Sequence, residues 1–136
     1  PHIVKSIQND SIDSRFKKPI KTMVDSSFFE IVIKGMQEVV EDKELGTSNN
    51  AYIAGIEVCG KTGTAQNPHG EDHSIFIAFA PKINPKIALA VYVENGGWGS
   101  SWGSPIGSLV IEKYLTDTIQ RKELEKVIME GVIEYN

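Results

Sequence analysis

Apolar residues recur along the chain at two spacings, one typical of helices and one typical of strands. Between Phe29 and Val40 they follow a helical period, and Ser27-Phe28-Phe29-Glu30 fits an N-terminal capping box, so we predict a helix over 27–42. Three later segments are rich in β-forming residues and are separated by turn residues: Ile56–Lys61, Ser74–Ala80 and Ile87–Val93. The pattern predicts three antiparallel strands in sequence order.

Weaker sequence patterns predict further elements before and after these segments. Near the N-terminus, short strands are predicted at Ile3-Val4, at Ile7 and at Ile20–Val24. A glycine-rich loop over 96–103 carries both tryptophans, and Ser104 followed by Pro105 is typical of a helix start. The predicted apolar stripe of that helix is Ile106, Leu109, Val110 and Tyr114, and a last short helix is predicted over Leu124–Ile133. The expected fold class is α+β, with helices packed on a small antiparallel sheet.

Composition, net charge and cysteine count argue against some classes of function. The chain is 40% hydrophobic and 24% charged, which is ordinary for a globular protein. Its net charge of -4 and scattered lysines argue against nucleic acid as a partner. A single cysteine excludes an internal disulfide, and no transmembrane stretch or signal peptide is recognised. Because the chain starts at Pro1 rather than Met, we expect it to derive from a longer protein.

Two candidate chemistries are disfavoured by their context. Residues 55–62 match G-x-x-x-x-G-K-[ST], the phosphate-binding loop of nucleotide-binding proteins. That loop must open a helix, whereas the spacer here has strand composition and Gly63 and Pro68 follow it. Cys59, His69 and His73 are metal-ligating residue types, but a zinc site needs three or four converging ligands. We therefore expect neither a metal nor another cofactor.

The third chemistry is acyl transfer at Lys61-Thr62-Gly63-Thr64. A strand edge beside a serine nucleophile can present a backbone N–H group to the oxyanion of a tetrahedral intermediate. Strand alternation places Thr62 and Thr64 on one side, where their hydroxyls can bind a carboxylate while Lys61 supplies positive potential. Gly63 removes a side chain where a ligand approaches the backbone. The alternative is a lysine-bearing strand in a non-catalytic α+β binding module.

The surroundings of this tetrapeptide carry a family resemblance. From Gly55 to Leu115 the chain resembles the C-terminal part of a class B penicillin-binding protein transpeptidase, in "GIEVCGKTGTAQ", "HSIFIAFAP", "KIALAVYVENGGWG" and "SPIGSLVIEKYL". The earlier "PHIVKSI", "GMQEVV" and "GTS" are also similar. The glycine-tryptophan loop is most similar to the elongation-specific branch. The whole chain, 1–136, is thus identified as a C-terminal part of such a domain, with 118–136 as an unspecific tail.

This resemblance implies a partial penicillin-binding or β-lactamase-like transpeptidase fold and D,D-transpeptidation of peptidoglycan. A serine would attack the D-Ala-D-Ala carbonyl of a stem peptide, and β-lactams would acylate the same serine. The N–H group of Thr64 would form half of the oxyanion hole, and Lys61, Thr62, Gly63 and Trp98 would line the cleft. The parent protein would sit in the bacterial inner membrane with its catalytic domain in the periplasm. It would work with the elongation machinery, including a membrane glycosyltransferase.

No credible nucleophile accompanies the motif. Ser14-Arg15-Phe16-Lys17 fits S-x-x-K, but Pro19 follows at once and opposes the required helix. Ser48-Asn49-Asn50 fits S-x-N, but it lies only a short loop before Lys61, whereas the family places that motif much earlier. We assign catalysis to neither serine. The chain by itself is therefore predicted to be soluble, inactive and prone to self-association through apolar faces.

Overall fold

The computed structural model describes residues 6–7, 10–11 and 21–133. Its elements in chain order are β1 (Ser6–Ile7), β2 (Asp10–Ser11), α1 (Ser26–Glu41), a 3₁₀ turn (Asn49–Ala51), β3 (Cys59–Ala65), β4 (His73–Ala80), β5 (Ile87–Val93), α2 (Gly103–Thr116) and α3 (Lys122–Glu130). β1 and β2 pair antiparallel with each other. Within the described ranges, no helix combines the length and the apolarity that crossing a membrane requires.

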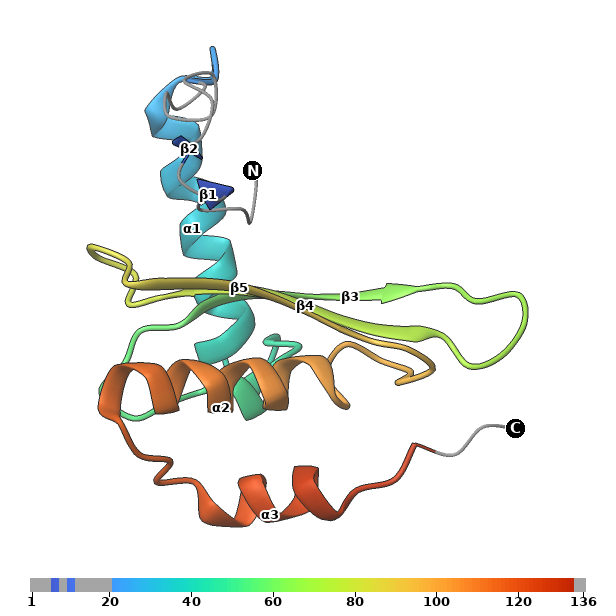
Figure 1. The fold of residues 1–136 in the computed structure, drawn as a ribbon. Helices are drawn as coiled ribbons and strands as arrows, with labels where there is room; N and C mark the ends of the chain where they lie inside the picture. Colours follow the sequence, from blue (N-terminus) through green and yellow to red (C-terminus); the bar gives the residue numbers. More distant parts are fainter. Residues whose placement is uncertain (1–5, 8–9, 12–20, 134–136) are drawn as a thin grey trace.

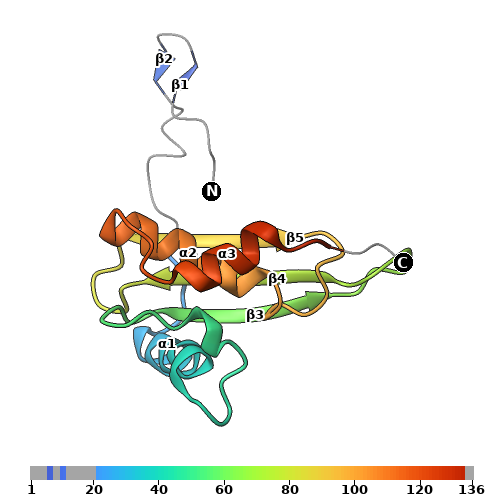
Figure 2. The same ribbon diagram turned by 90° about the horizontal axis from the view of Figure 1, so that it is seen from below.

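The main sheet is an antiparallel meander in the order β3-β4-β5, which confirms the predicted topology. α2 lies on one face of the sheet and α3 packs outside α2 (Figure 1). α1 stands beside the β3 edge with its axis across the plane of the sheet, as Figure 2 shows from below. The predicted α+β class, with helices packed on a small antiparallel sheet, is therefore confirmed.

The core lies between α2 and the central strand β4. Alternate β4 residues Ser74, Phe76, Ala78 and Ala80 are buried, as strand periodicity requires. The ring of Phe76 fits between two glycines: a Cβ on Gly60 would lie 2.5 Å from it, and one on Gly107 would lie 2.8 Å away. Burial of such a side chain contributes about 2–3 kcal/mol. Gly60 therefore has a packing reason to be glycine, independent of any ligand.

α1 begins one residue before its predicted range, and its N-cap lies two residues before the one that the capping box predicts. Asp25 is the N-cap, and its side chain accepts a hydrogen bond from the N–H group of Ser27 at 2.9 Å. The prediction that Ser27 caps this helix, with Glu30 at N3, is wrong, because the carboxylate of Asp25 already occupies that role. Only the C-terminal half of α1 packs on the sheet, and Val40 is its buried residue. Near its N-terminus, Phe29 is 45% exposed despite belonging to the predicted stripe.

α2 buries only part of its predicted stripe, Leu109, together with residues outside that stripe. The buried residues of α2 are Gly103, Ser104, Pro105, Gly107, Ser108, Leu109, Ile111 and Glu112. Their mostly small side chains let the helix approach β4 and β5 closely. Of the predicted stripe, Val110 and Tyr114 are exposed, and this side of α2 faces a cavity of about 470 Å³ shared with α3. The helix also starts at Gly103 with Trp102 as its N-cap, so Ser104 and Pro105 lie two positions further inside it than the predicted N-cap and N1.

Several strands and helices begin or end at residues other than those predicted. β3 starts at Cys59 rather than Ile56, because Ile53 and Ile56 form an isolated bridge around Gly55, whose φ is +79°. It ends at Ala65 rather than Lys61, so Thr62, Gly63 and Thr64 lie inside the strand. β5 has its predicted bounds, and β4 begins one residue earlier than predicted. α3 begins two residues and ends three residues earlier than predicted. Residues 21–24 are not in a strand, contrary to the prediction for 20–24. Ile7 lies in β1 as predicted, whereas Ile3, Val4 and Ile20 fall outside the described residues.

Candidate functional site

The tetrapeptide Lys61-Thr62-Gly63-Thr64 lies in the middle of β3. Its cross-strand partners on β4 identify the face that each side chain occupies. Thr62 and Thr64 pair with buried Phe76 and Ser74, so both threonines are on the face that carries α2. Lys61 and Gly63 are on the opposite face by alternation. The predicted common orientation of the two threonines is thus confirmed.

The backbone N–H and C=O groups of this segment point alternately toward β4 and toward the opposite edge of β3. A Cβ on Gly99 would lie 2.5 Å from the carbonyl oxygens of both Gly63 and Ile75, which are cross-strand partners, so both oxygens lie in the gap between β3 and β4. In an antiparallel ladder, alternate residues turn their N–H and C=O groups to opposite edges. Thr62 and Thr64 therefore present their backbone groups to the edge of β3 away from β4. In agreement, the Thr62 carbonyl accepts a hydrogen bond from Lys61 Nζ at 2.8 Å.

The side chains at this edge are accessible and polar. Lys61 and Thr64 are exposed and Thr62 is half-buried. The hydroxyls of Thr62 and Thr47 lie 3.0 Å apart, which joins β3 to the loop that follows α1. Thr47 was not among the predicted site residues, and the only sequence signal for it was its place in the family-like "GTS" segment. A cation and two hydroxyls beside a free strand edge form a suitable binding surface for an anionic group.

The glycine-rich loop between β5 and α2 lies against the same segment. Gly99 packs directly on the backbone of Gly63, where any side chain would clash. Trp98 precedes this contact and its side chain is 74% exposed. Its carbonyl accepts a hydrogen bond from the buried hydroxyl of Ser74, the residue opposite Thr64. The predicted site residues are thus brought together, with Trp98 reaching β3 through its neighbour in the loop.

The two serine motifs that the sequence contains supply no nucleophile in the part of the chain that the structure describes. Ser48 is 1% exposed, and its hydroxyl lies 3.5 Å from the side-chain oxygen of Asn50. Asn50 itself holds backbone and side-chain groups of the glycine-rich loop and α2. This segment therefore has a structural role. Ser14 and Lys17 lie outside the described residues.

The nucleotide and metal alternatives lack the geometry they need. Residues 59–65 are a strand that continues into a turn, so no helix opens after Lys61 and the phosphate-binding loop interpretation fails. Over the described ranges, no three His, Cys, Asp or Glu side chains gather into a metal-holding group. Cys59 is fully buried, and burial raises the pKa of its thiol. His73 Nδ1 accepts a hydrogen bond from the Asn95 N–H group at 3.0 Å.

Comparison with known proteins agrees with this arrangement. The model of the penicillin binding protein transpeptidase domain matches residues 1–113. Peptidoglycan D,D-transpeptidase MrdA of Haemophilus influenzae is 31% identical over 142 residues, covering 90% of this chain and 22% of that protein. Peptidoglycan D,D-transpeptidase PbpA of Mycobacterium tuberculosis is 31% identical, over 85% of this chain and 25% of its own length.

A solved structure supports the same relationship. PBP2 of Pseudomonas aeruginosa, in complex with WCK 5153, has 33% identity and a TM-score of 0.59, covering 86% of this chain and 25% of that one. The chain thus spans about a quarter or less of the length of each of these three proteins. By family match, sequence identity and fold, the chain belongs to the penicillin-binding protein transpeptidase domain family.

Proposed function

We propose that this chain supplies one wall of a peptidoglycan D,D-transpeptidase active site, and that the rest of that site lies in the parent protein. This wall is the Lys-Thr-Gly motif, the third family motif after S-x-x-K and S-x-N. The observation that carries the proposal is the position of Lys61 to Thr64. They occupy an exposed edge strand, with the backbone groups of both threonines turned outward and a cation beside them. The family membership and the names of the relatives support the reaction class.

Each residue of this wall has a distinct role in the proposed reaction. The N–H group of Thr64 donates to the oxyanion that forms when a serine attacks the D-Ala-D-Ala carbonyl of a stem peptide. The hydroxyls of Thr62 and Thr64 hold the terminal carboxylate, and the ammonium group of Lys61 adds positive potential. Gly63 lets the ligand lie close to the strand. Trp98 lines one side of the cleft through the loop that rests on Gly63.

The covalent steps involve groups outside this wall. The serine oxygen bonds to the carbonyl carbon, the terminal D-Ala leaves with a proton, and an acyl-enzyme results. The amine of a neighbouring stem peptide then displaces the serine and forms the cross-link. A β-lactam acylates the same serine by opening its ring. We place this serine, its lysine base and the second motif in the portion of the transpeptidase domain that precedes the present chain in the parent protein.

The cellular setting is part of the same proposal. Both relatives named above are peptidoglycan D,D-transpeptidases, and the structural neighbour is a PBP2. We infer that the parent works in cell-wall elongation as a penicillin-binding protein 2 beside a membrane glycosyltransferase. Stem peptides and β-lactams are its ligands, and it is anchored in the inner membrane with this domain in the periplasm.

A labelling experiment tests the function. The complete gene product that contains this chain should become covalently labelled by a fluorescent penicillin, with one label per molecule. The chain 1–136 alone should stay unlabelled, because a wall without a nucleophile cannot form the acyl bond. Thr64→Pro, which removes the N–H donor, should slow labelling of the complete protein about a hundredfold or more. Stoichiometric labelling of the isolated chain would contradict the proposal, and so would a complete protein that takes no label.

A further inference from the structure

Two side chains outside the Lys61–Thr64 segment form hydrogen bonds with the glycine-rich loop. Ser74 joins the loop to β4, and Asn50 joins it to the 3₁₀ turn Asn49–Ala51. The loop runs from Gly96 to Trp102 and crosses β3 and β4 beside α2. A Cβ on Gly99 would lie 2.5 Å from the Gly63 carbonyl oxygen and 2.9 Å from the Gly63 nitrogen. The loop backbone is therefore seated directly on the Lys61–Thr64 segment, and anything that holds the loop also shapes that surface.

The first tie is Ser74, a β4 residue with 0% exposure. Its hydroxyl donates to the carbonyl oxygen of Trp98 at 2.7 Å and accepts from the N–H group of Gly103 at 2.9 Å. One side chain thus binds both ends of the segment 98–103. Since Ser74 pairs with Thr64 across the ladder, this tie lies next to the threonine on which the proposed oxyanion hole depends.

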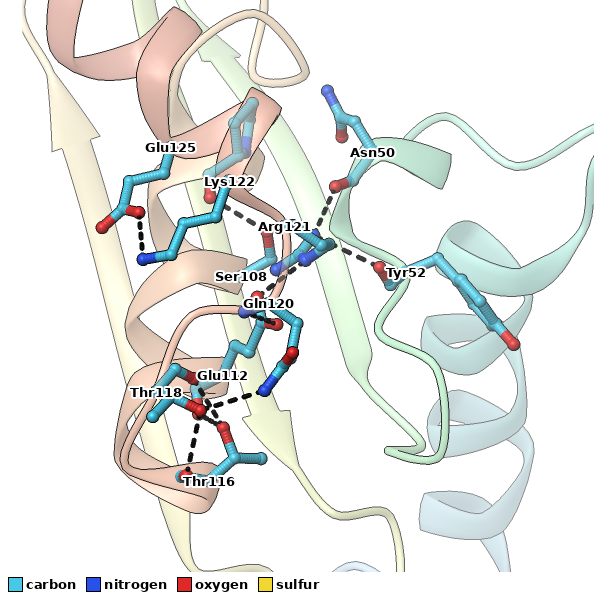
Figure 3. Close-up of polar contacts among 11 residues, drawn as sticks. Asn50, Tyr52, Ser108, Glu112, Thr116, Thr118, Gln120, Arg121, Lys122 and Glu125 are labelled. Atoms are coloured by element: carbon cyan, nitrogen blue, oxygen red, sulfur yellow. Dashed lines mark hydrogen bonds and ion pairs between the residues drawn. The ribbon is translucent and has the colours of Figure 1, made fainter.

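The second tie is Asn50, which follows the loop after α1. Its Nδ2 donates to the Ser100 carbonyl at 2.6 Å, and its Oδ1 accepts from the Ser104 hydroxyl at 2.7 Å. Behind it, Arg121 Nη1 donates to the Asn50 carbonyl at 3.0 Å (Figure 3). Arg121 lies beyond residues 1–113, the part that the family model matches. The C-terminal segment therefore braces this tie from outside the shared domain core.

We propose that Ser74 is a positioning residue of the cleft and that Asn50 reinforces it. Together they hold Trp98 and its loop at a set position relative to Thr62 and Thr64. The inference rests on the proposed function. A segment with glycine at three of its seven positions, 96, 97 and 99, is intrinsically mobile, so an untied loop would occupy the binding-competent position only part of the time. The apparent affinity for a ligand falls by that fraction.

The kinetic test uses the complete gene product and benzylpenicillin. Saturation of the acylation rate separates the dissociation constant of the initial complex from the rate constant of acylation. In Ser74→Ala we expect the dissociation constant to rise about tenfold, the equivalent of one or two hydrogen bonds, with little change in the acylation rate constant. A purely structural role would lower the fraction of protein that reacts and leave the dissociation constant unchanged.

Ser108→Ala is the matched control. Ser108 is also a serine with 0% exposure, but its hydroxyl donates to the Pro105 carbonyl within α2 and does not contact the loop. It should change neither constant. Asn50→Ala should raise the dissociation constant in the same direction as Ser74→Ala, and it tests the inference even if Ser74→Ala does not fold. Equal constants for wild type and for both loop-tie variants would overturn the inference.

A second readout does not depend on acylation. Trp98 and Trp102 are the two tryptophans of the chain. Trp98 is already 74% exposed and Trp102 is half-buried, so an increase in acrylamide quenching reports that the loop has opened at Trp102. Ser74→Ala in the chain 1–136 should increase quenching, and Ser108→Ala should not. A wild-type protein without label overturns the proposed function and the cleft role of Ser74 together. Labelling with unchanged affinity and unchanged quenching in Ser74→Ala overturns the role of Ser74 alone.

Discussion

At the scale of single residues, the least expected feature is a nearly buried ion pair at the C-terminal end of the fold. Glu112 on α2 is 2% exposed and accepts from Arg121 Nε and from the Gln120 N–H group, each at 2.8 Å (Figure 3). Burial alone would raise the pKa of Glu112, but these hydrogen bonds and the charge of Arg121 outweigh it and hold the pKa below 4.5. Arg121 thus ties the segment after Asp117 to α2 and to the 3₁₀ turn.

Glu112→Gln should lower the free energy of unfolding of the chain by about 2 kcal/mol at pH 7, because it removes a charged acceptor from a buried site. The difference from wild type should be complete above pH 4.5 and should shrink as the pH falls through the lower pKa of the folded protein. Urea unfolding between pH 3 and pH 7 measures it. Glu125→Gln, which neutralises the exposed pair with Lys122, should cost less than about 0.5 kcal/mol. Equal losses in both variants would contradict this assignment.

At the scale of elements, α1 and α2 show that hydrophobic periodicity predicts the buried surface of a helix only in part. The face of α2 that packs on β4 is built from small residues such as Gly107 and Ser108, and a hydrophobicity pattern gives them no weight. Its bulkier residues, including Val110, face α3 or solvent. In α1 the apolar pattern is real, but only the half near Val40 reaches the sheet. Helix existence was predictable from local pattern, whereas the buried face depended on which partner was near.

Gly35 in α1 and Gly60 in β3 should respond to alanine substitution in opposite ways. Gly35 is inside α1 with no atom within 4 Å of an added Cβ, so Gly35→Ala should raise the free energy of unfolding by about 1 kcal/mol. Gly60→Ala places its Cβ 2.5 Å from the Phe76 ring and should destabilise the chain. Urea midpoints of the two variants measure the effect. A destabilising Gly35→Ala would show that this face of α1 is already in contact with another surface.

At the scale of the whole molecule, the described residues leave two apolar surfaces uncovered. The N-terminal half of α1 exposes Phe28 at 62% and Ile31 at 72%, and it stands clear of the sheet (Figure 1). On the sheet face opposite α2, Ile77 and Tyr92 are also exposed. Exposed apolar surface of this kind is typical of an interface. The proposed parent domain would cover it with the portion that lies outside this chain.

We therefore expect the chain 1–136 to self-associate with increasing concentration, as measured by light scattering. The double variant Phe28→Ser with Ile31→Ser should shift the equilibrium toward monomer, because it removes apolar area from α1. Ile83→Ser is the control, since Ile83 is equally exposed at 67% but stands alone in the turn between β4 and β5. A monomer at all concentrations, or an equal response to the control, would contradict this expectation.

The sequence by itself indicated the family, through the resemblance of whole segments, and predicted the three-stranded meander. The meander followed from local signals, namely β-forming runs bounded by turn residues, although the first strand was predicted to end at Lys61 and extends to Ala65. Only the tertiary structure decided that small residues form much of the buried face of α2, and that Ser74, Asn50 and Arg121 hold the loop and the tail. Such contacts join residues far apart in the chain, up to 71 positions for Arg121 and Asn50. These contacts gain their energy from burial and hydrogen bonding between surfaces that meet only in the folded chain. The spacing of apolar residues along a single helix or strand therefore does not predict them.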